Sequence, residues 1–335
     1  VGGSFVPACA GVARVDPEVL SLRVDVEPHP DHGAARLKGL DLVPQDARVI
    51  GVDDANVIPL DRAAPEVEAR RAQGEEGGKA AEGFVATTRD EDIADPGMMF
   101  SGERATSAAF ADIVVSIPPA ENRKIGEVQW PKRLPPDPGK EFVTLRADRI
   151  DEDMAVATFR QRLAASDDKH VLVFVHGYNN RFEDAVYRFA QIVHDSGADV
   201  VPVLFTWPSR GKLVAYNYDR ESANYSRDAL ERILNLMAAN KQVSQISILA
   251  HSMGNWLTLE SLRQMSIRNG HINVKIRDVM LAAPDVDVDV FRTQVATFGE
   301  PRPRFTLFVS RNDKALAVSR RIWGRTARLG AIDPN

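Results

Sequence analysis

The hydrophobic positions in the second half of the chain fall into short continuous runs separated by amphipathic segments. The runs predict strands at residues 84–88, 112–117, 170–175, 199–205, 245–250, 274–283 and 304–310. Hydrophobic residues at helical spacing predict helices at residues 182–193, 227–239 and 255–267. Strands without polar alternation, separated by helices, indicate an α/β fold with a mostly parallel sheet flanked by helices.

The pattern differs before residue 83. Residues 20–62 hold short alternating runs that predict strands of an accessory segment without recognisable chemistry. Residues 63–82 contain almost no large apolar side chains. Such a stretch is typical of a linker, because it buries too little surface to offset its ordering entropy. We therefore expect the α/β domain to occupy residues 83–335.

The first residues, 1–19, admit two interpretations. They begin with the uncharged sequence VGGSFVPACA, which resembles the end of a secretory signal and a bacterial lipoprotein cleavage box with Cys9 as the site of a lipid anchor. This interpretation predicts an exported protein, periplasmic or membrane-anchored. The other is a disordered terminus with an incidental cysteine, which leaves a cytoplasmic location.

Composition narrows the classes of partner. The 335 residues carry a net charge of −5, whereas a general nucleic-acid binder needs a basic field to meet phosphates. A single cysteine excludes an internal disulfide and a thiolate-based metal centre. No hydrophobic run reaches the roughly 18 residues that span a bilayer.

The sharpest chemical signal is the sequence AHSMG at residues 250–254, between a predicted strand and a predicted helix. It matches the G-x-S-x-G nucleophile turn, with the small residue Ala250 in place of the first glycine. The turn would lift the hydroxyl of Ser252 above the carboxyl edge of the sheet. The backbone N–H of Met253 would then meet a developing oxyanion. The alternative is a serine that caps an ordinary helix.

A second candidate element is HGYNN at residues 176–180, directly after a buried strand. Glycine lets the backbone approach a reacting centre, so the N–H of Tyr178 or Asn179 is a candidate second oxyanion donor, with Tyr178 preferred. The candidates for substrate contact are His176, Gly177, Asn179, Trp207 and His251. For Trp207, a structural turn with a packed ring is an equally good interpretation.

A catalytic triad on such a sheet runs in the order serine, acid, histidine. Asp313 follows the predicted strand at 304–310 and is the preferred acid, because the strand two after the nucleophile's is the usual donor. Asp285, after the preceding strand, is the alternative. No histidine follows Asp313, and the side chain of His251 should diverge from Ser252 across the turn. We therefore expect the base in a C-terminal portion beyond Asn335, without which the chain would be inactive.

Together these motifs resemble the bacterial α/β-hydrolase family of unknown function DUF900, whose members are described as esterase- or lipase-like. The motifs are FVATTR (84–89), FSGER (100–104), VSIPP (115–119), VFVHGYNN (173–180), FTWPSRG (205–211), LAHSMGNW (249–256), LAAPDVD (281–287) and SRNDKAL (310–316). The resemblance runs from about Gly83 to the C-terminus. It implies an α/β-hydrolase fold with Ser252 as nucleophile, an acid at Asp313 or Asp285, and a histidine after residues 328–330.

These residues predict a serine hydrolase that cleaves carboxylic esters, of small molecules or lipids, through an acyl-enzyme on Ser252. The reaction needs no metal or cofactor. Thioesterase, amidase and acyltransferase chemistry would use the same residues. The alternative from another class is a non-catalytic cell-envelope protein whose degenerate hydrolase domain binds a ligand.

Overall fold

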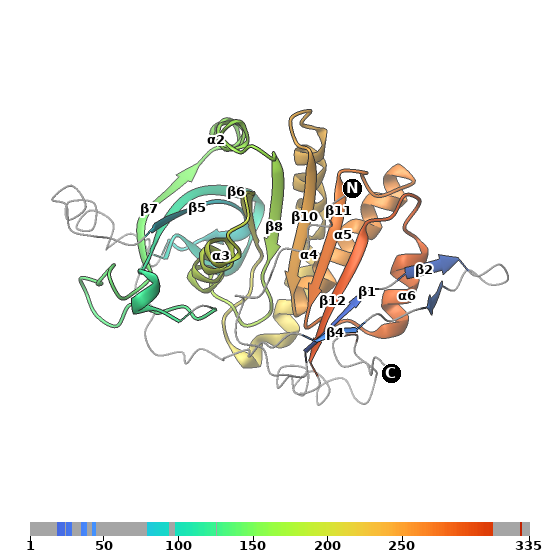
Figure 1. Cartoon of the computed structure of the whole chain (residues 1–335), viewed down its shortest axis with the longest axis horizontal. Coiled ribbons are helices and arrows are strands. Elements are labelled where there is room, and N and C mark those ends of the chain that lie inside the picture. The colour runs from blue at the N-terminus through green and yellow to red at the C-terminus, as the bar shows by residue number, and fades with distance from the viewer. Residues whose placement is uncertain are drawn as a thin grey trace.

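A mixed sheet forms the centre of the computed structural model, which describes residues 19–23, 25–28, 35–38, 42–44, 79–93, 98–124, 126–310 and 329 (Figure 1). Within those residues the sheet has ten strands in the order β4-β1-β12-β11-β10-β8-β9-β5-β6-β7. Their bounds are β1 (Val19–Arg23), β4 (Leu42–Pro44), β5 (Lys79–Glu91), β6 (Phe100–Ile117), β7 (Val143–Ile150), β8 (His170–Val175), β9 (Val201–Thr206), β10 (Gln245–His251), β11 (Ile276–Ala282) and β12 (Arg304–Ser310). The strands from β12 to β5 are parallel, and the strands beyond them are antiparallel.

Helices cover both faces of this sheet (Figure 1). The helices are α2 (Glu152–Ala165), α3 (Phe182–Ser196), α4 (Tyr216–Ala239), α5 (Met253–Asn269) and α6 (Val288–Ala296), with the short 3-10 turns η2 (Ala120–Asn122) and η3 (Leu213–Ala215). Apolar residues of α3 pack in one core cluster, and those of the other α-helices pack in a second. The fold is therefore the predicted α/β arrangement with a mostly parallel sheet.

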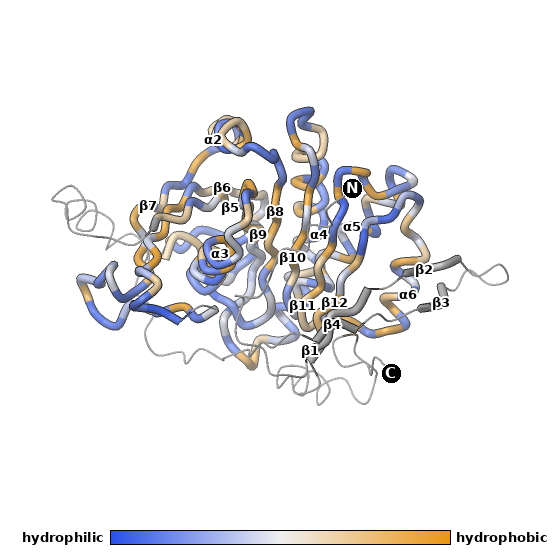
Figure 2. Tube along the Cα trace, viewed as in Figure 1, coloured by the Kyte–Doolittle hydropathy of each residue, from blue (hydrophilic) through white to orange (hydrophobic). Residues whose placement is uncertain are grey.

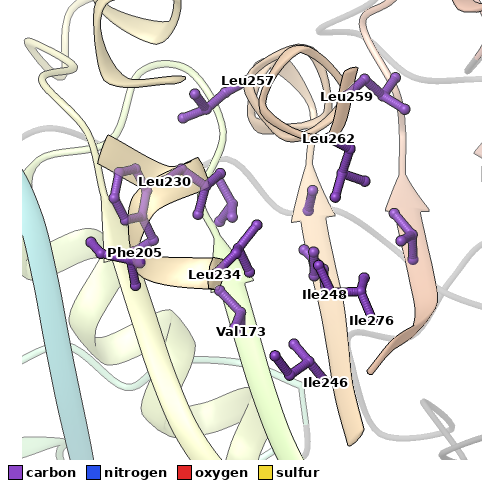
Figure 3. Close-up of a cluster of buried hydrophobic side chains, with 14 of the residues drawn as sticks. Val173, Phe205, Leu230, Leu234, Ile246, Ile248, Leu257, Leu259, Leu262 and Ile276 are labelled. Carbon is purple, nitrogen blue, oxygen red and sulfur yellow. The ribbon is translucent and has the colours of Figure 1, made fainter. Parts of the chain in front are cut away.

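The side chains of β8 point alternately to the two faces of the sheet, and so contribute to both core clusters. Val171 and Val173 face α4 and α5, whereas Leu172 and Phe174 face α3, and all four side chains are buried. A strand that is covered on both faces gains from apolar residues at every position, which is why β8 reads as an uninterrupted run. Figure 2 shows the hydrophobic colouring of these inner strands. Figure 3 shows Leu230 and Leu234 of α4 directed toward the strands.

The predicted elements are present, but three of them begin much earlier than predicted, among them β6, which starts at Phe100 and not at residue 112. Helix α4 begins at Tyr216, well before the predicted start at residue 227. Its first turns bury small and polar side chains such as Ser222 and Ala223, so they lack the apolar spacing that marks the second half. Strand β5 begins at Lys79, inside the predicted linker. Strand β7 and helices α2 and α6 were not predicted, since none shows a strong apolar pattern.

Short strands from the predicted accessory segment also contribute. Strand β1 pairs with β12 and β4 pairs with β1, so both extend the main sheet. The strands β2 (Asp25–Pro28) and β3 (Ala35–Lys38) form a separate antiparallel pair. The predicted terminal segment with Cys9, most of the linker and Asp313 lie outside the described residues. No described helix combines the length and hydrophobicity that a membrane span requires.

Candidate active site

The carboxyl ends of β8 and β10 meet where the strand order reverses. From β8 the chain moves to β9 on one side, and it later returns to β10 on the other. Open α/β sheets bind ligands outside the carboxyl ends of their strands at such a reversal. The loop after β8 and the turn after β10 face each other here, since a β-carbon on Gly177 would lie 3.0 Å from Cβ of Ser252.

Ser252 occupies a strained turn between β10 and α5. Its φ of 50° and ψ of −120° fall in a region that residues other than glycine rarely adopt. The N–H of Ser252 donates to the carbonyl of Ala282 at 2.9 Å, and Nδ2 of Asn255 donates to the carbonyl of Ser252 at 2.8 Å. The Ser252 side chain makes no capping hydrogen bond to α5, unlike the serine of an ordinary helix cap. The backbone therefore has the geometry expected of a nucleophile turn.

Small residues make room for this turn. A β-carbon on Gly254 would lie 2.3 Å from the carbonyl oxygen of His176 and 2.8 Å from that of Val175, so only glycine fits. Ala250 is fully buried, and its methyl group belongs to the core cluster that contains residues of α4 and α5. The first small position of the motif thus tolerates alanine, whereas the last requires glycine.

In the loop at residues 176–180, here called the oxyanion loop, two backbone N–H groups donate hydrogen bonds to side chains of other segments. The N–H of Asn179 donates to Oδ2 of Asp219 at 3.3 Å, and the N–H of Asn180 donates to Oγ of Ser209 at 3.1 Å. Within the described part of the chain, the N–H of Tyr178 has no acceptor. Of the two predicted donors in this loop, Tyr178 is therefore the one that is available. Met253 supplies the first N–H of α5, which has no partner within its helix.

Asp219 anchors the oxyanion loop to α4. Its fully buried carboxylate also accepts hydrogen bonds from Oγ of Ser209 at 2.5 Å and from the N–H of Arg210 at 3.0 Å. Burial raises the pKa of Asp219, and these donors oppose the rise. Asn179, a predicted substrate contact, has a left-handed φ of 59°. Its side-chain oxygen is buried and has no hydrogen-bond partner among the described residues.

His176 and Trp207, two other predicted substrate contacts, are buried side chains that support the loop from within. Their rings stack with centroids 4.9 Å apart. The backbone N–H of Trp207 donates to Nε2 of His176 at 3.0 Å. The ring proton of His176 is therefore on Nδ1, which donates to the carbonyl of Gly177 at 2.8 Å. Burial and the charge of Arg89 hold the pKa of His176 well below its usual range. The packed-ring interpretation of Trp207 fits its position, and neither ring is placed to contact substrate.

The alternative acid, Asp285, lies beside the nucleophile turn. Its backbone N–H donates to the carbonyl of Ser252 at 3.4 Å, and its buried carboxylate accepts a hydrogen bond from Tyr216. The Tyr216 ring contacts the Tyr178 ring edge-on, with centroids 5.1 Å apart. Burial raises the pKa of Tyr178 to about 12, so its phenol stays neutral. The position of the preferred acid, Asp313, is not among those described.

Of the histidines whose positions are described, His251 adjoins Ser252. A β-carbon on Gly177 would lie 2.6 Å from Nδ1 of His251, so this ring and Ser252 pack against the same glycine. His176 has both ring nitrogens engaged. The others lie away from this edge: His170 at the start of β8, His194 near the end of α3 and His271 after α5.

Two residues of the site, Asp219 and Asn255, were not singled out from the sequence, and Tyr216 was considered only as part of a lid and not as a partner of Asp285. Asp219 and Tyr216 lie in the polar first turns of α4, where no motif marks them. Asn255 follows the nucleophile motif directly, and its amide ties Ser252 to β11 through the carbonyl of Ala282 at 2.9 Å. Only Asn255 could have been found from sequence, through its place in LAHSMGNW.

Comparison with known proteins agrees with the observed fold. The family described as "Alpha/beta hydrolase of unknown function (DUF900)" matches residues 151–335, more than half of the chain. The uncharacterized protein alr1448 of Nostoc sp. is 27% identical over 141 residues, which cover 35% of this chain and 37% of that protein. The chain thus aligns with little more than a third of this relative's length. No solved structure is significantly similar. The chain belongs to the family of α/β hydrolases of unknown function DUF900.

Proposed function

We propose that this protein is a serine hydrolase that cleaves carboxylic esters through an acyl-enzyme on Ser252. The observation that carries the proposal is the strained turn of Ser252, which faces the oxyanion loop across Gly177. Backbone strain at a serine between strand and helix is costly, and it persists where it exposes a nucleophile. The α/β-hydrolase family match supports hydrolysis as the class of reaction.

The reaction follows from the groups at this edge. Oγ of Ser252 attacks the ester carbonyl while a histidine base takes its proton, and the oxyanion accepts hydrogen bonds from the N–H groups of Met253 and Tyr178. Collapse of this intermediate breaks the bond to the alcohol oxygen, which takes the proton from the base. Water then attacks the acyl-enzyme with the same base, releases the acid and restores Ser252. No histidine among the described residues forms a hydrogen bond with Ser252, and the pH–rate profiles of histidine variants identify the base.

The side chains near the carboxyl ends of β8 and β10 favour an apolar substrate. Leu213 and Val214 of η3 are 65% and 94% exposed. This turn is joined to the oxyanion loop, because the Tyr178 hydroxyl donates to the carbonyl of Leu213 at 2.5 Å. Exposed apolar side chains on a turn joined to the loop that faces Ser252 would cover the acyl or alcohol chain of an uncharged ester.

The test is hydrolysis of p-nitrophenyl acetate, butyrate and octanoate by the full-length protein. Ser252→Ala is compared with Ser266→Ala, which removes a buried hydroxyl about 20 Å along the same helix. We expect Ser252→Ala to lose at least about a thousandfold in kcat/KM and Ser266→Ala to keep wild-type turnover per folded molecule. Equal rates for wild type and Ser252→Ala would contradict the proposal and favour the non-catalytic alternative.

A further inference from the structure

Arg89, near the end of β5, connects two loops of the candidate site to the start of β6 from inside the protein. Its side chain is buried, with 1% of the residue exposed. One terminal nitrogen, Nη1, donates to the carbonyls of Ser101 at 3.1 Å and Ser209 at 2.8 Å. The other, Nη2, donates to the carbonyl of Asn180 in the oxyanion loop at 2.8 Å. One guanidinium therefore joins the start of β6, the loop after β9 and the oxyanion loop.

The charge of this group is retained despite burial. Burial lowers the pKa of Arg89 to about 10, and the nearby carboxylates of Glu183, Asp219 and Asp184 oppose the change. Arg89 therefore stays protonated at neutral pH. A buried charge costs stability unless it is paired and hydrogen-bonded, and an apolar side chain would fill the same space at lower cost. Packing alone thus gives a poor account of an arginine at this position.

The contacts of the oxyanion loop indicate what Arg89 does. The N–H of Asn179 is held by Asp219, the N–H of Asn180 by Ser209, and the carbonyl of Asn180 by Arg89. With these groups engaged, the N–H of Tyr178 is the one among residues 178–180 that is left for a ligand. Arg89 ends the FVATTR motif, but the family match begins at residue 151 and not near Gly83, so that match assigns Arg89 no role.

We infer that Arg89 is a positioning residue, which fixes the oxyanion loop so that the Tyr178 N–H meets the oxyanion. The inference rests on the proposed ester hydrolysis at Ser252. Donors placed before the reaction need no reorganisation in the transition state, so a loosened loop lowers kcat more than it weakens substrate binding. A side chain that only stabilised the fold would change the melting temperature and leave kcat per folded molecule unaltered.

The experiment compares Arg89→Met with Arg123→Met in the full-length protein. Arg123 is a matched control, since its side chain is 4% exposed and it binds Asp195 and His194 at the opposite end of α3. Measured well below the lower of the two melting temperatures, kcat for p-nitrophenyl butyrate should fall about 30-fold or more in Arg89→Met, with KM changed less than about threefold. Arg123→Met should keep kcat while losing comparable stability. Labelling of Ser252 by a fluorophosphonate should slow in parallel with kcat.

A conservative variant keeps the test decisive if Arg89→Met does not fold. Arg89→Lys retains the charge but cannot reach three carbonyls from one planar group, so its kcat should fall about tenfold, between wild type and Arg89→Met. If kcat of Arg89→Lys and of any folded Arg89→Met stays within threefold of Arg123→Met, the positioning role is wrong. If wild type is no faster than Ser252→Ala, the proposed hydrolysis itself is wrong, which is a separate result.

Discussion

The hydroxyl of Tyr216 donates a 2.6 Å hydrogen bond to Oδ2 of Asp285, and this pair lies at the turn that carries Ser252. A buried carboxylate that accepts a hydrogen bond from a phenol is held in one orientation. Asp285 therefore has a structural partner at the site, whatever its part in the chemistry. This bears on which of the two candidate acids completes a triad with Ser252.

The acids are distinguished by amide substitution. We predict that Asp313→Asn lowers kcat about 10⁴-fold, the effect of removing the acid that orients a catalytic histidine. Asp285→Asn should cost less than about 100-fold, because its observed partner is Tyr216. Steady-state kinetics on p-nitrophenyl butyrate give both numbers. A larger loss for Asp285→Asn than for Asp313→Asn would reassign the acid to Asp285.

Gly254 should be the least replaceable residue of the nucleophile turn. In Gly254→Ala the new methyl group would meet two backbone oxygens, that of His176 at 2.3 Å and that of Val175, the last residue of β8, at 2.8 Å. We expect a loss of more than about 3 kcal/mol in unfolding free energy, measured by urea denaturation. Gly270→Ala, at the other end of α5, is the matched control. It has a φ of 80° and open space around it, so it should cost only about 1–2 kcal/mol of backbone strain.

Glu183 should make the protein less stable as the pH rises. Burial raises the pKa of this carboxyl to about 7 from its ordinary 4.5, with Asp184 raising it further while Arg89 and Arg181 oppose the shift. The folded state therefore binds more protons than the unfolded state between these values. The unfolding free energy falls across this window, by on the order of 3 kcal/mol at most.

Glu183→Gln removes that ionisation. We expect the variant to unfold at higher denaturant concentration than wild type at pH 8, and at nearly the same concentration at pH 4.5. Glu221→Gln, at an exposed position on α4, should show no such difference between the two pH values. A Glu183→Gln protein that is destabilised at pH 8 would show that the charged carboxylate is favourable in the fold.

His251 should not be the catalytic base. Nδ1 of His251 and Cβ of Ser252 both pack against Gly177, but no hydrogen bond joins these two side chains among the described residues. We predict that His251→Ala keeps at least about a tenth of wild-type kcat, with the loss due to altered packing against Gly177. A loss near that of Ser252→Ala, together with disappearance of the acidic limb of the pH–rate profile, would identify His251 as the base.

The parts of this fold that were predicted are those with local signals. The inner parallel strands are uninterrupted apolar runs because both faces are covered, and the motif at Ser252 encodes its own turn through Gly254. The beginning of α4 was missed because, after Tyr216, its buried face consists of Asp219 and small side chains. The burial of Asp219 depends on hydrogen bonds from Ser209, Arg210 and Asn179, and no apolar pattern along a helix indicates such bonds.

The polar contacts behind the site could not be predicted for a different reason. Arg89 reaches Asn180 and Ser209 across separations of about a hundred residues, which no local pattern encodes. His176 lies in a motif that suggests substrate contact, yet its ring is committed to Trp207 inside the core. Sequence located the candidate site, whereas the roles of side chains within it depend on the packing of distant segments.

The central claim is that Ser252 forms a covalent acyl intermediate. The most direct measurement is mass spectrometry of the full-length protein quenched in acid within milliseconds of mixing with p-nitrophenyl butyrate. The account predicts a transient mass increase of one butyryl group, located on the peptide that contains Ser252 and absent from Ser252→Ala. Ester cleavage without any acyl group on Ser252, or with the acyl group on another residue, would contradict it.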